Sequence, residues 1–223
     1  MIAYHDMPVA GTRQDGARFL AGRHTLMPFP RQDDMGIVAD VCQSFVFDNG
    51  AFSVWKKGGK LDVDGYTAWI EQWHRHPGLD WPLIPDVIDG DESANDPLLE
   101  ACPKKLRGVT VRHLHESLDR LQRLAIGSTG QWAHRGTAVC WKRMGSVMDP
   151  ICDDQGRSAC HLHGLRMLEP ATLQNLPFAS ADSTNAAVNG GSIRRFGMYV
   201  PPAAGQRACV MADRIEGYNS SSI

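Results

Sequence analysis

Residues 44–52, SFVFDNGAF, join a short apolar run to an acid, an amide and a glycine. An apolar run of this length, bounded by turn-forming residues, is typical of a strand that is buried on both faces. Similar runs recur along the chain: RHTLMPF (23–29), WPLIPDVID (81–89), GVTVRHLH (108–115), RLAIGS (123–128), CHLHGL (160–165) and PFASAD (177–182). We interpret all of these runs as buried strands.

Helical spacing fills most of the intervals between these runs. The clearest cases are MGIVADVC (35–42), YTAWIEQW (66–73) and TAVCWKRMGSVM (137–148). Apolar residues at three- and four-residue intervals predict the buried positions, which are Ile37, Val38 and Val41, then Tyr66, Trp69, Ile70 and Trp73, then Val139, Met144 and Val147. Asp64 and Thr137 are the expected N-caps of the second and third helices. Strands that alternate with helices predict a parallel sheet.

The predicted fold class is therefore α/β, and the expected architecture is a compact TIM-like (β/α)8 barrel with one unit irregular or missing. The eighth strand is expected either at FGMYV (196–200) or within the first residues. A doubly wound open sheet is the alternative, although no glycine-rich phosphate loop follows the first predicted strand. We divide the chain into a polar N-terminal lead-in (1–20), a single barrel domain (21–215) and a frayed tail (216–223).

The composition is that of an ordinary globular protein, with 43% hydrophobic and 22% charged residues and a net charge of −2. This balance excludes a strong overall positive field, so any contact with nucleic acid must come from a local basic patch. The candidate patches are Lys56, Lys57 and Lys60, then Lys104, Lys105 and Arg107, then Arg194 and Arg195. A solvated surface is the alternative interpretation of each patch.

Cysteine usage and hydropathy bear on cofactors and location. The six cysteines are scattered and form no C-x-x-C pair, so no zinc site is recognisable and no cofactor is expected. The first residues lack the apolar core of a signal peptide, and no apolar run reaches membrane-spanning length. We expect a cytoplasmic protein with free thiols and no membrane partner.

Carboxylates follow two of the predicted strands. Asp48 ends the run SFVFD and Asp182 ends the run PFASAD. In a parallel barrel the strand ends face one rim, where active sites are found. A carboxylate nucleophile and a second carboxyl that acts as acid and base are the minimal equipment for cleaving a glycosidic bond. We predict that Asp182 and Asp48 are the catalytic pair, roughly 5–9 Å apart; ordinary cap and turn roles are the alternative.

Neighbouring residues are expected to support this pair. The hydroxyls of Ser183 and Thr184, with nearby backbone N–H groups, are candidate donors that keep Asp182 ionised. Gly50 permits a tight turn and the close approach of a flat ligand, on which Phe52 can stack.

Other strand ends supply further candidates for substrate binding. Gly127 and Ser128 offer backbone N–H groups to a carbonyl or phosphate oxygen. Asp86 and Asp89 suit the ring N–H and amine of a purine, although their acidic segment also suits Mg²⁺. The pairs His113 and His115, and His161 and His163, each face one side of a strand and so line a pocket or its core. The remaining candidates at the strand ends are Asn49, Gly164 and Arg166.

Four of these segments together resemble one enzyme group. FDNGAF (47–52) is similar to an L-D-S-G-A-F motif, LAIGS (124–128) to V-G-x-G-S, HLHGLRML (161–168) to H-G-F-G-L, and ASADST (179–184) to S-A-D-S. In this order they resemble the tRNA-guanine transglycosylase superfamily, and most closely its DNA-acting branch, the deoxypurine-in-DNA transglycosylases of phages and bacteria. The resemblance runs from about residue 21 to about residue 195.

The resemblance implies a pentosyltransferase that exchanges a guanine in DNA for a 7-deazaguanine. Asp182 would attack C1′ of the deoxyribose, and Asp48 would be the acid/base partner or would position the incoming base. Asp89, or else Asp86, would read the Watson–Crick side of the base, and Gly127 and Ser128 would contact its carbonyl. Such an enzyme must take its base out of the duplex or act on a single strand.

Departures from the family pattern keep other functions open. The C-x-C-x-x-C zinc site of the tRNA-acting members has no counterpart, and Asn49 replaces a serine. The short chain lacks long nucleic-acid-embracing insertions, so a nucleotide is the alternative substrate, and a homodimer or an accessory protein is a candidate source of further DNA contacts. The alternative functions are an N-glycoside hydrolase acting on a nucleotide or modified base, and a catalytically silent binding barrel.

Overall fold

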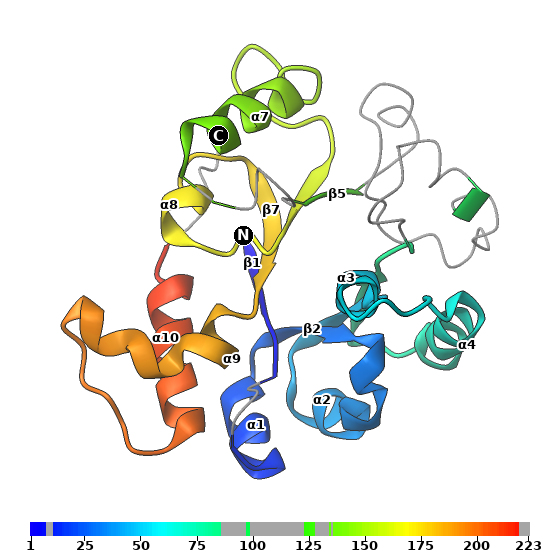
Figure 1. Ribbon diagram of the computed structural model, residues 1–223, viewed down its shortest axis with the longest axis vertical. Helices are drawn as coiled ribbons and strands as arrows, with labels where there is room; N and C mark the ends of the chain where they lie inside the picture. Colours follow the sequence, from blue (N-terminus) through cyan, green and yellow to red (C-terminus); the bar gives the residue numbers. More distant parts are fainter. Residues whose placement is uncertain (8–10, 86–96, 99–122, 128–133, 135, 219–223) are drawn as a thin grey trace.

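The computed structural model describes the chain except for residues 8–10, 86–96, 99–122, 128–133, 135 and 219–223 (Figure 1). The described residues form one sheet of seven strands, all parallel, in the order β4-β3-β2-β1-β7-β6-β5. The strands are β1 (Ile2–His5), β2 (His24–Pro28), β3 (Ser44–Asp48), β4 (Leu79–Pro82), β5 (Arg123–Gly127), β6 (His161–Leu165) and β7 (Phe178–Ser183). The predicted α/β class with a parallel sheet is confirmed.

Helices follow most of the strands and lie around the outside of the sheet (Figure 1). The α-helices are α1 (Arg13–Leu20), α2 (Met35–Val41), α3 (Ala51–Lys56), α4 (Val63–Trp73), α7 (Ala138–Met148), α8 (Pro170–Leu173), α9 (Asn185–Asn189) and α10 (Ala204–Glu216). Among the described residues, two 3-10 helices, η1 (Phe29–Asp34) and η5 (Gly190–Phe196), precede α2 and α10.

Alternate residues of the strands enter different apolar clusters. Phe45 and Phe47 of β3 pack toward the helices, and the ring of Phe47 stacks on Trp69 of α4 with centroids 3.8 Å apart. Val46 lies between them in sequence but faces the other side of the sheet. Its cluster draws on strands across the whole sheet: Tyr4, Leu26, Trp81, Leu83 and Ala125.

The inner cluster shows that the sheet is curled. Trp81 belongs to β4 and Arg123 to β5, the two edge strands, yet the Arg123 guanidinium lies 5.4 Å from the Trp81 ring centre. The same indole packs edge-on against His163 of β6 at 4.7 Å between centroids. Side chains from both edges of the described sheet therefore meet on its concave face.

The prediction of a loose lead-in is wrong, whereas the alternative position of the eighth strand, within the first residues, is confirmed. These first residues form β1, which pairs with β2 on one side and β7 on the other, and α1, which packs on α10. Thr12 and Asp15 form a capping box at the start of α1. The run IAYH is short, but it is buried because it lies at the centre of the sheet.

Details of the predicted helices are confirmed in part. Thr137 caps α7, and its hydroxyl accepts from the N–H of Cys140 at 3.3 Å. The cap of α4 is Asp62, which accepts from Gly65 N–H, and not Asp64, which lies inside the first turn. Val139 is 50% exposed, because the buried stripe of α7 runs through Cys140, Met144 and Val147 instead.

The strand FGMYV is a wrong prediction. This segment begins at Phe196, the last residue of η5, and Tyr199 within it is 78% exposed. Gly197 ends η5 in the left-handed conformation with φ 71°, and two prolines without N–H groups follow at 201 and 202. β4 begins at Leu79 instead of Trp81, whereas GVTVRHLH and most of the predicted tail lie outside the described residues.

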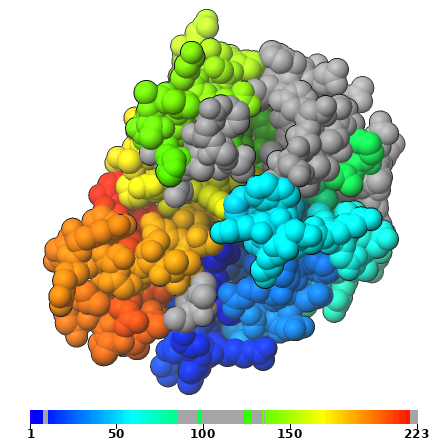
Figure 2. Space-filling model, viewed as in Figure 1, coloured from blue at the N-terminus to red at the C-terminus, as the bar shows by residue number. Residues whose placement is uncertain are grey.

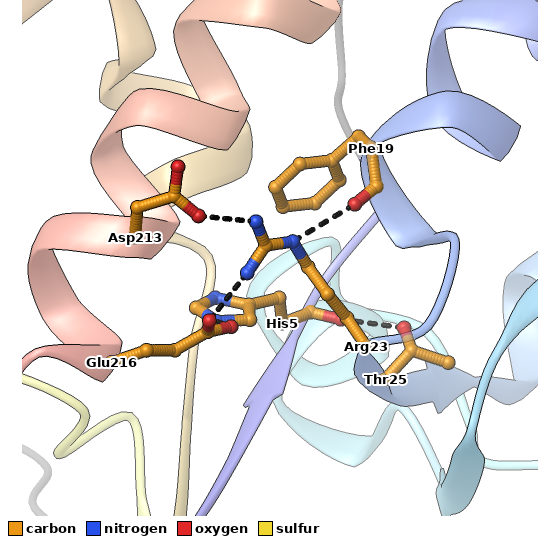
Figure 3. Close-up of polar contacts among 6 residues, drawn as sticks. All are labelled: His5, Phe19, Arg23, Thr25, Asp213 and Glu216. Atoms are coloured by element: carbon orange, nitrogen blue, oxygen red, sulfur yellow. Dashed lines mark hydrogen bonds and ion pairs between the residues drawn. The ribbon is translucent and has the colours of Figure 1, made fainter.

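A polar network attaches α10 to the strands (Figure 3). Arg23 reaches two carboxylates of α10, with Nη2 2.5 Å from Asp213 Oδ1 and Nη1 2.5 Å from Glu216 Oε2. The buried His5 of β1 bonds to the other Glu216 oxygen through Nε2 at 2.9 Å. Arg23 also donates to the carbonyl of Phe19 at 3.1 Å, so its guanidinium joins α1 to α10, and His5 joins β1 to the same Glu216 carboxylate.

We expect Glu216→Gln to weaken this attachment in a pH-dependent way. Burial alone would raise the pKa of Glu216, but its bonds to His5 and Arg23 outweigh burial and lower the pKa to about 2. A depressed pKa adds stability above the unfolded pKa of 4.5, and this stability is lost as the pH falls toward 2. Because the carboxylate is 35% exposed, the loss at pH 7 should be only about 1–2 kcal/mol.

Urea unfolding at pH 7 and pH 3 tests this expectation. The difference between the parent and Glu216→Gln should shrink by about half or more at the lower pH. Asp33→Asn, at an exposed position in η1, is the control and should change little at either pH. An equal deficit for Glu216→Gln at both pH values would contradict the ionic role.

Candidate active site

The site lies at the carboxyl ends of the central strands. Asp182 is near the end of β7, Asp48 ends β3, and Asp6 directly follows β1. The negative charges of Asp182 and Asp48 both act on the Asp6 carboxyl, so all three carboxylates belong to one electrostatic cluster. The separation of Asp48 from Asp182 stays a prediction.

Asp182 is buried and firmly oriented. Its residue is 5% exposed, and Oδ1 accepts a hydrogen bond from the backbone N–H of Arg166 at 3.0 Å. His163 Nε2 lies 3.2 Å from the same oxygen. The main chain is fixed as well, because Leu168 N–H donates to the Asp182 carbonyl at 3.0 Å.

His163 connects Asp182 to a second strand residue. Its ring is fully buried, and Nδ1 lies 2.9 Å from the hydroxyl of Ser180. Because a carboxylate can only accept, Nε2 must carry the proton, and a neutral ring then accepts from the Ser180 hydroxyl at Nδ1. The chain Ser180–His163–Asp182 therefore holds one carboxylate oxygen in a set direction.

These donors differ from the expected ones. Ser183 Oγ accepts from the N–H of Asn185 at 2.9 Å, at the start of α9. Since side chains alternate along a strand, Ser183 faces away from the side on which Ser180 and Asp182 lie. The prediction that the Ser183 hydroxyl holds Asp182 is thus corrected: that role falls to β6 and to the backbone after it.

Asp6 was missed by the sequence analysis. Burial, together with the charges of Asp182 and Asp48, raises the pKa of Asp6 to about 8, although Arg31 and Arg166 lower it in part. One oxygen, Oδ1, is buried and has no hydrogen-bond partner among the described residues. An acid directly after the apolar run IAYH was the available signal, hidden because that run is so short.

The β3 end is built by a tight turn. Asn49 is buried, its Oδ1 accepts from Ala51 N–H at 2.7 Å, and its Nδ2 donates to the Ile84 carbonyl at 3.3 Å. Gly50 has φ 74° and would place a Cβ 2.7 Å from Cδ of Pro30. Glycine is needed at position 50 for the turn, as predicted, and because any side chain there would clash with Pro30. Asn49 holds the strand end in place through its two hydrogen bonds.

Residues that follow strands in opposite halves of the sheet contact each other at the strand ends. The Arg166 guanidinium, after β6, lies 3.9 Å from the ring centre of Phe52 in α3. In Figure 2 the cyan residues of α3 and the yellow residues near β6 and β7 meet toward the middle of this face. Arg166 is also the only described residue other than glycine with a positive φ, 58°, which aims its N–H at Asp182.

The other predicted site residues divide into two groups. Gly164 is explained by packing, since a Cβ there would lie 2.9 Å from both Met167 and Phe178. Gly127 is exposed at the end of β5. The remaining candidates lie outside the described residues: Asp86, Asp89, His113, His115 and Ser128.

Within the described ranges, no group of three or more His, Cys, Asp or Glu side chains is placed to hold a metal ion. None of the described helices is long and apolar enough to cross a membrane. The five cysteines in the described part of the chain are unpaired.

Comparison of the chain with known protein families, curated proteins and solved structures finds no match.

Proposed function

We propose that this protein is a transglycosylase that exchanges a purine base in DNA through a covalent intermediate on Asp182. The observation that carries the proposal is the orientation of one buried carboxylate by His163 and the Arg166 N–H, inside a cluster with two other carboxyls. An ordinary cap or turn does not require a buried aspartate with two such donors and like-charged neighbours.

The proposed reaction has two matched halves. An Asp182 oxygen forms a bond to C1′ as the C1′–N bond to the base breaks, and a second carboxyl donates a proton to the departing base. The entering base returns a proton to that carboxyl and displaces Asp182 from C1′. The entering base is proposed to be a 7-deazaguanine, on the motif resemblance alone.

Residues at the rim support a base that is turned out of a strand. Phe52 and the 46% exposed Trp55 lie on one side of α3, with ring centroids 5.9 Å apart. Lys56 and Lys57 follow at the end of the same helix and are exposed. Aromatic rings beside cations are the usual means of holding unpaired bases and their phosphates. This combination favours DNA over a free nucleotide.

We also propose the finer architecture, a closed TIM-like barrel. The contact of Arg123 with Trp81 and the shared inner cluster support it, because side chains of the two edge strands already meet. Active sites of such barrels lie at the strand ends that carry Asp6, Asp48 and Asp182.

The orienting role of His163 gives a graded prediction. We expect His163→Ala to lower the exchange rate by about 10- to 100-fold, since hydrogen bonds to a charged group are worth about 1.5–3 kcal/mol. Ser180→Ala should have a smaller effect in the same direction, because it removes only the partner of Nδ1. Single-turnover exchange rates measure both effects. A larger loss of rate for Ser180→Ala than for His163→Ala would contradict the proposed order of the Ser180–His163–Asp182 hydrogen bonds.

Incorporation of radiolabelled guanine into guanine-containing DNA tests the function. Label in the polymer with the parent protein is the expected result. Release of base without incorporation would instead identify a hydrolase. A folded protein that neither incorporates label nor releases base would overturn glycosidic chemistry at this site.

A further inference from the structure

Asp6 occupies the middle of the cluster. It follows β1, which lies between β2 and β7, so it sits beside the strand that carries Asp182. Because side chains alternate along a strand, Asp6 continues the inward row of Tyr4, which belongs to the inner cluster. Among the residues that the structure describes, no side chain or backbone group bonds to its buried Oδ1.

Two negative and two positive groups act on Asp6. Asp182 and Asp48 are negative, Arg31 and Arg166 are positive, and His163 reaches the cluster through Asp182. Both cations are engaged elsewhere.

Arg31 donates to Asp34 Oδ2 at 2.9 Å and to the Met7 carbonyl at 3.1 Å. Arg166 lies on Phe52. Three carboxyls in one electrostatic cluster cannot all stay ionised at low cost. Asp6, whose buried Oδ1 has no hydrogen-bond donor among the described residues, is the one that keeps a proton.

We propose that Asp6 is a third catalytic residue, the acid that protonates the departing base and the base that deprotonates the entering one. This inference rests on the proposed function and leaves Asp48 to position the base. In the first half the O–H bond of Asp6 breaks, its proton goes to the departing base, and the C1′–N electron pair leaves with that base. In the second half the Asp6 carboxylate recovers a proton from the entering base, so no other reactant is needed.

Two departing bases separate this role from a structural one. Guanine must be protonated as it leaves, whereas 7-methylguanine already carries a positive charge and departs without an acid. We expect Asp6→Asn to slow release of guanine from DNA by about 100-fold or more, the usual contribution of a general acid. Release of 7-methylguanine should stay within about tenfold of the parent rate.

The controls distinguish the two proposals. Asp182→Asn should lose both releases, and Asp33→Asn should lose neither. If Asp6→Asn slows both bases equally, or slows neither, the Asp6 role is overturned while exchange through Asp182 stands. If the parent releases neither base, the proposed function fails and the Asp6 role fails with it.

Titration of the carboxyl groups gives a readout that does not need activity. In protein with ¹³C-labelled aspartate carboxyls, one resonance should titrate with a midpoint near pH 8 and be missing from Asp6→Asn. The parent exchange rate should fall above the same pH, because Asp6 then loses its proton. Unperturbed aspartates titrate near pH 4. A parent protein in which every aspartate titrates below about pH 5 would therefore overturn the inference.

Discussion

Asp182→Asn is expected to abolish incorporation of labelled guanine into DNA, with a loss of at least about 10⁴-fold, as for other enzymes that lose their nucleophile. An amide nitrogen or oxygen cannot form the glycosyl ester that the mechanism requires. The fold should survive, since the amide oxygen of asparagine can still accept from the Arg166 N–H, which lies 3.0 Å from Oδ1.

Two measurements check this result. Counting of polymer-bound label measures exchange, and a denaturing gel reveals the covalent protein–DNA adduct, which should form with the parent and not with Asp182→Asn. Asp33→Asn should match the parent in both assays. Incorporation by Asp182→Asn within tenfold of the parent rate would remove Asp182 from the role of nucleophile.

Gly50→Ala is expected to have the largest effect on stability. Gly50 has φ 74°, where a side chain costs about 1–2 kcal/mol. The added methyl group would also lie 2.7 Å from Cδ and 2.9 Å from Cγ of Pro30, whose ring is fixed in η1. We expect a total loss of about 2–4 kcal/mol. Exchange should fall too, since Asp48 precedes this turn.

Gly58→Ala is the matched control. Gly58 has φ 69°, but nothing lies within 4 Å of a Cβ built on it. The two variants share the backbone strain and differ in the contact with Pro30. Thermal unfolding should show a smaller decrease in melting temperature for Gly58→Ala, because its added methyl group meets no neighbour. In a chain of this size, about 1 kcal/mol corresponds to roughly 2–4 °C. Equal decreases in melting temperature for the two variants would mean that Pro30 moves aside without destabilising the fold.

The predictions that held came from local patterns. The runs around Val46, Ile126 and Ala181 are strands because each carries enough apolar side chains to be buried on both faces. Thr137 caps α7 because a hydroxyl satisfies a free N–H wherever the helix packs. Such features need only a few neighbouring residues.

The predictions that failed depended on distant residues. Ile2–His5 is so short a run that the first residues were only one of two positions for the eighth strand, but pairing with β2 and β7 makes it the centre of the sheet. FGMYV had a strand-like composition, but Gly197 and the following prolines leave it without a neighbour to pair with. Val139 had the right spacing, but the side of α7 that packs on the sheet lies elsewhere.

By itself the sequence determined the α/β class, most of the strands and the pairing of acids with strand ends, since these follow from hydrophobic period and local turns. The strand order, the hydrogen-bond donors to Asp182 and the place of Asp6 in the carboxylate cluster became known only from the three-dimensional structure. His163 and Arg166 lie in β6 or directly after it, Asp182 lies in β7, and Asp6 follows β1 at the other end of the chain. Hydrogen bonds and charge interactions among them act over a few ångströms of space, whatever the number of residues between them.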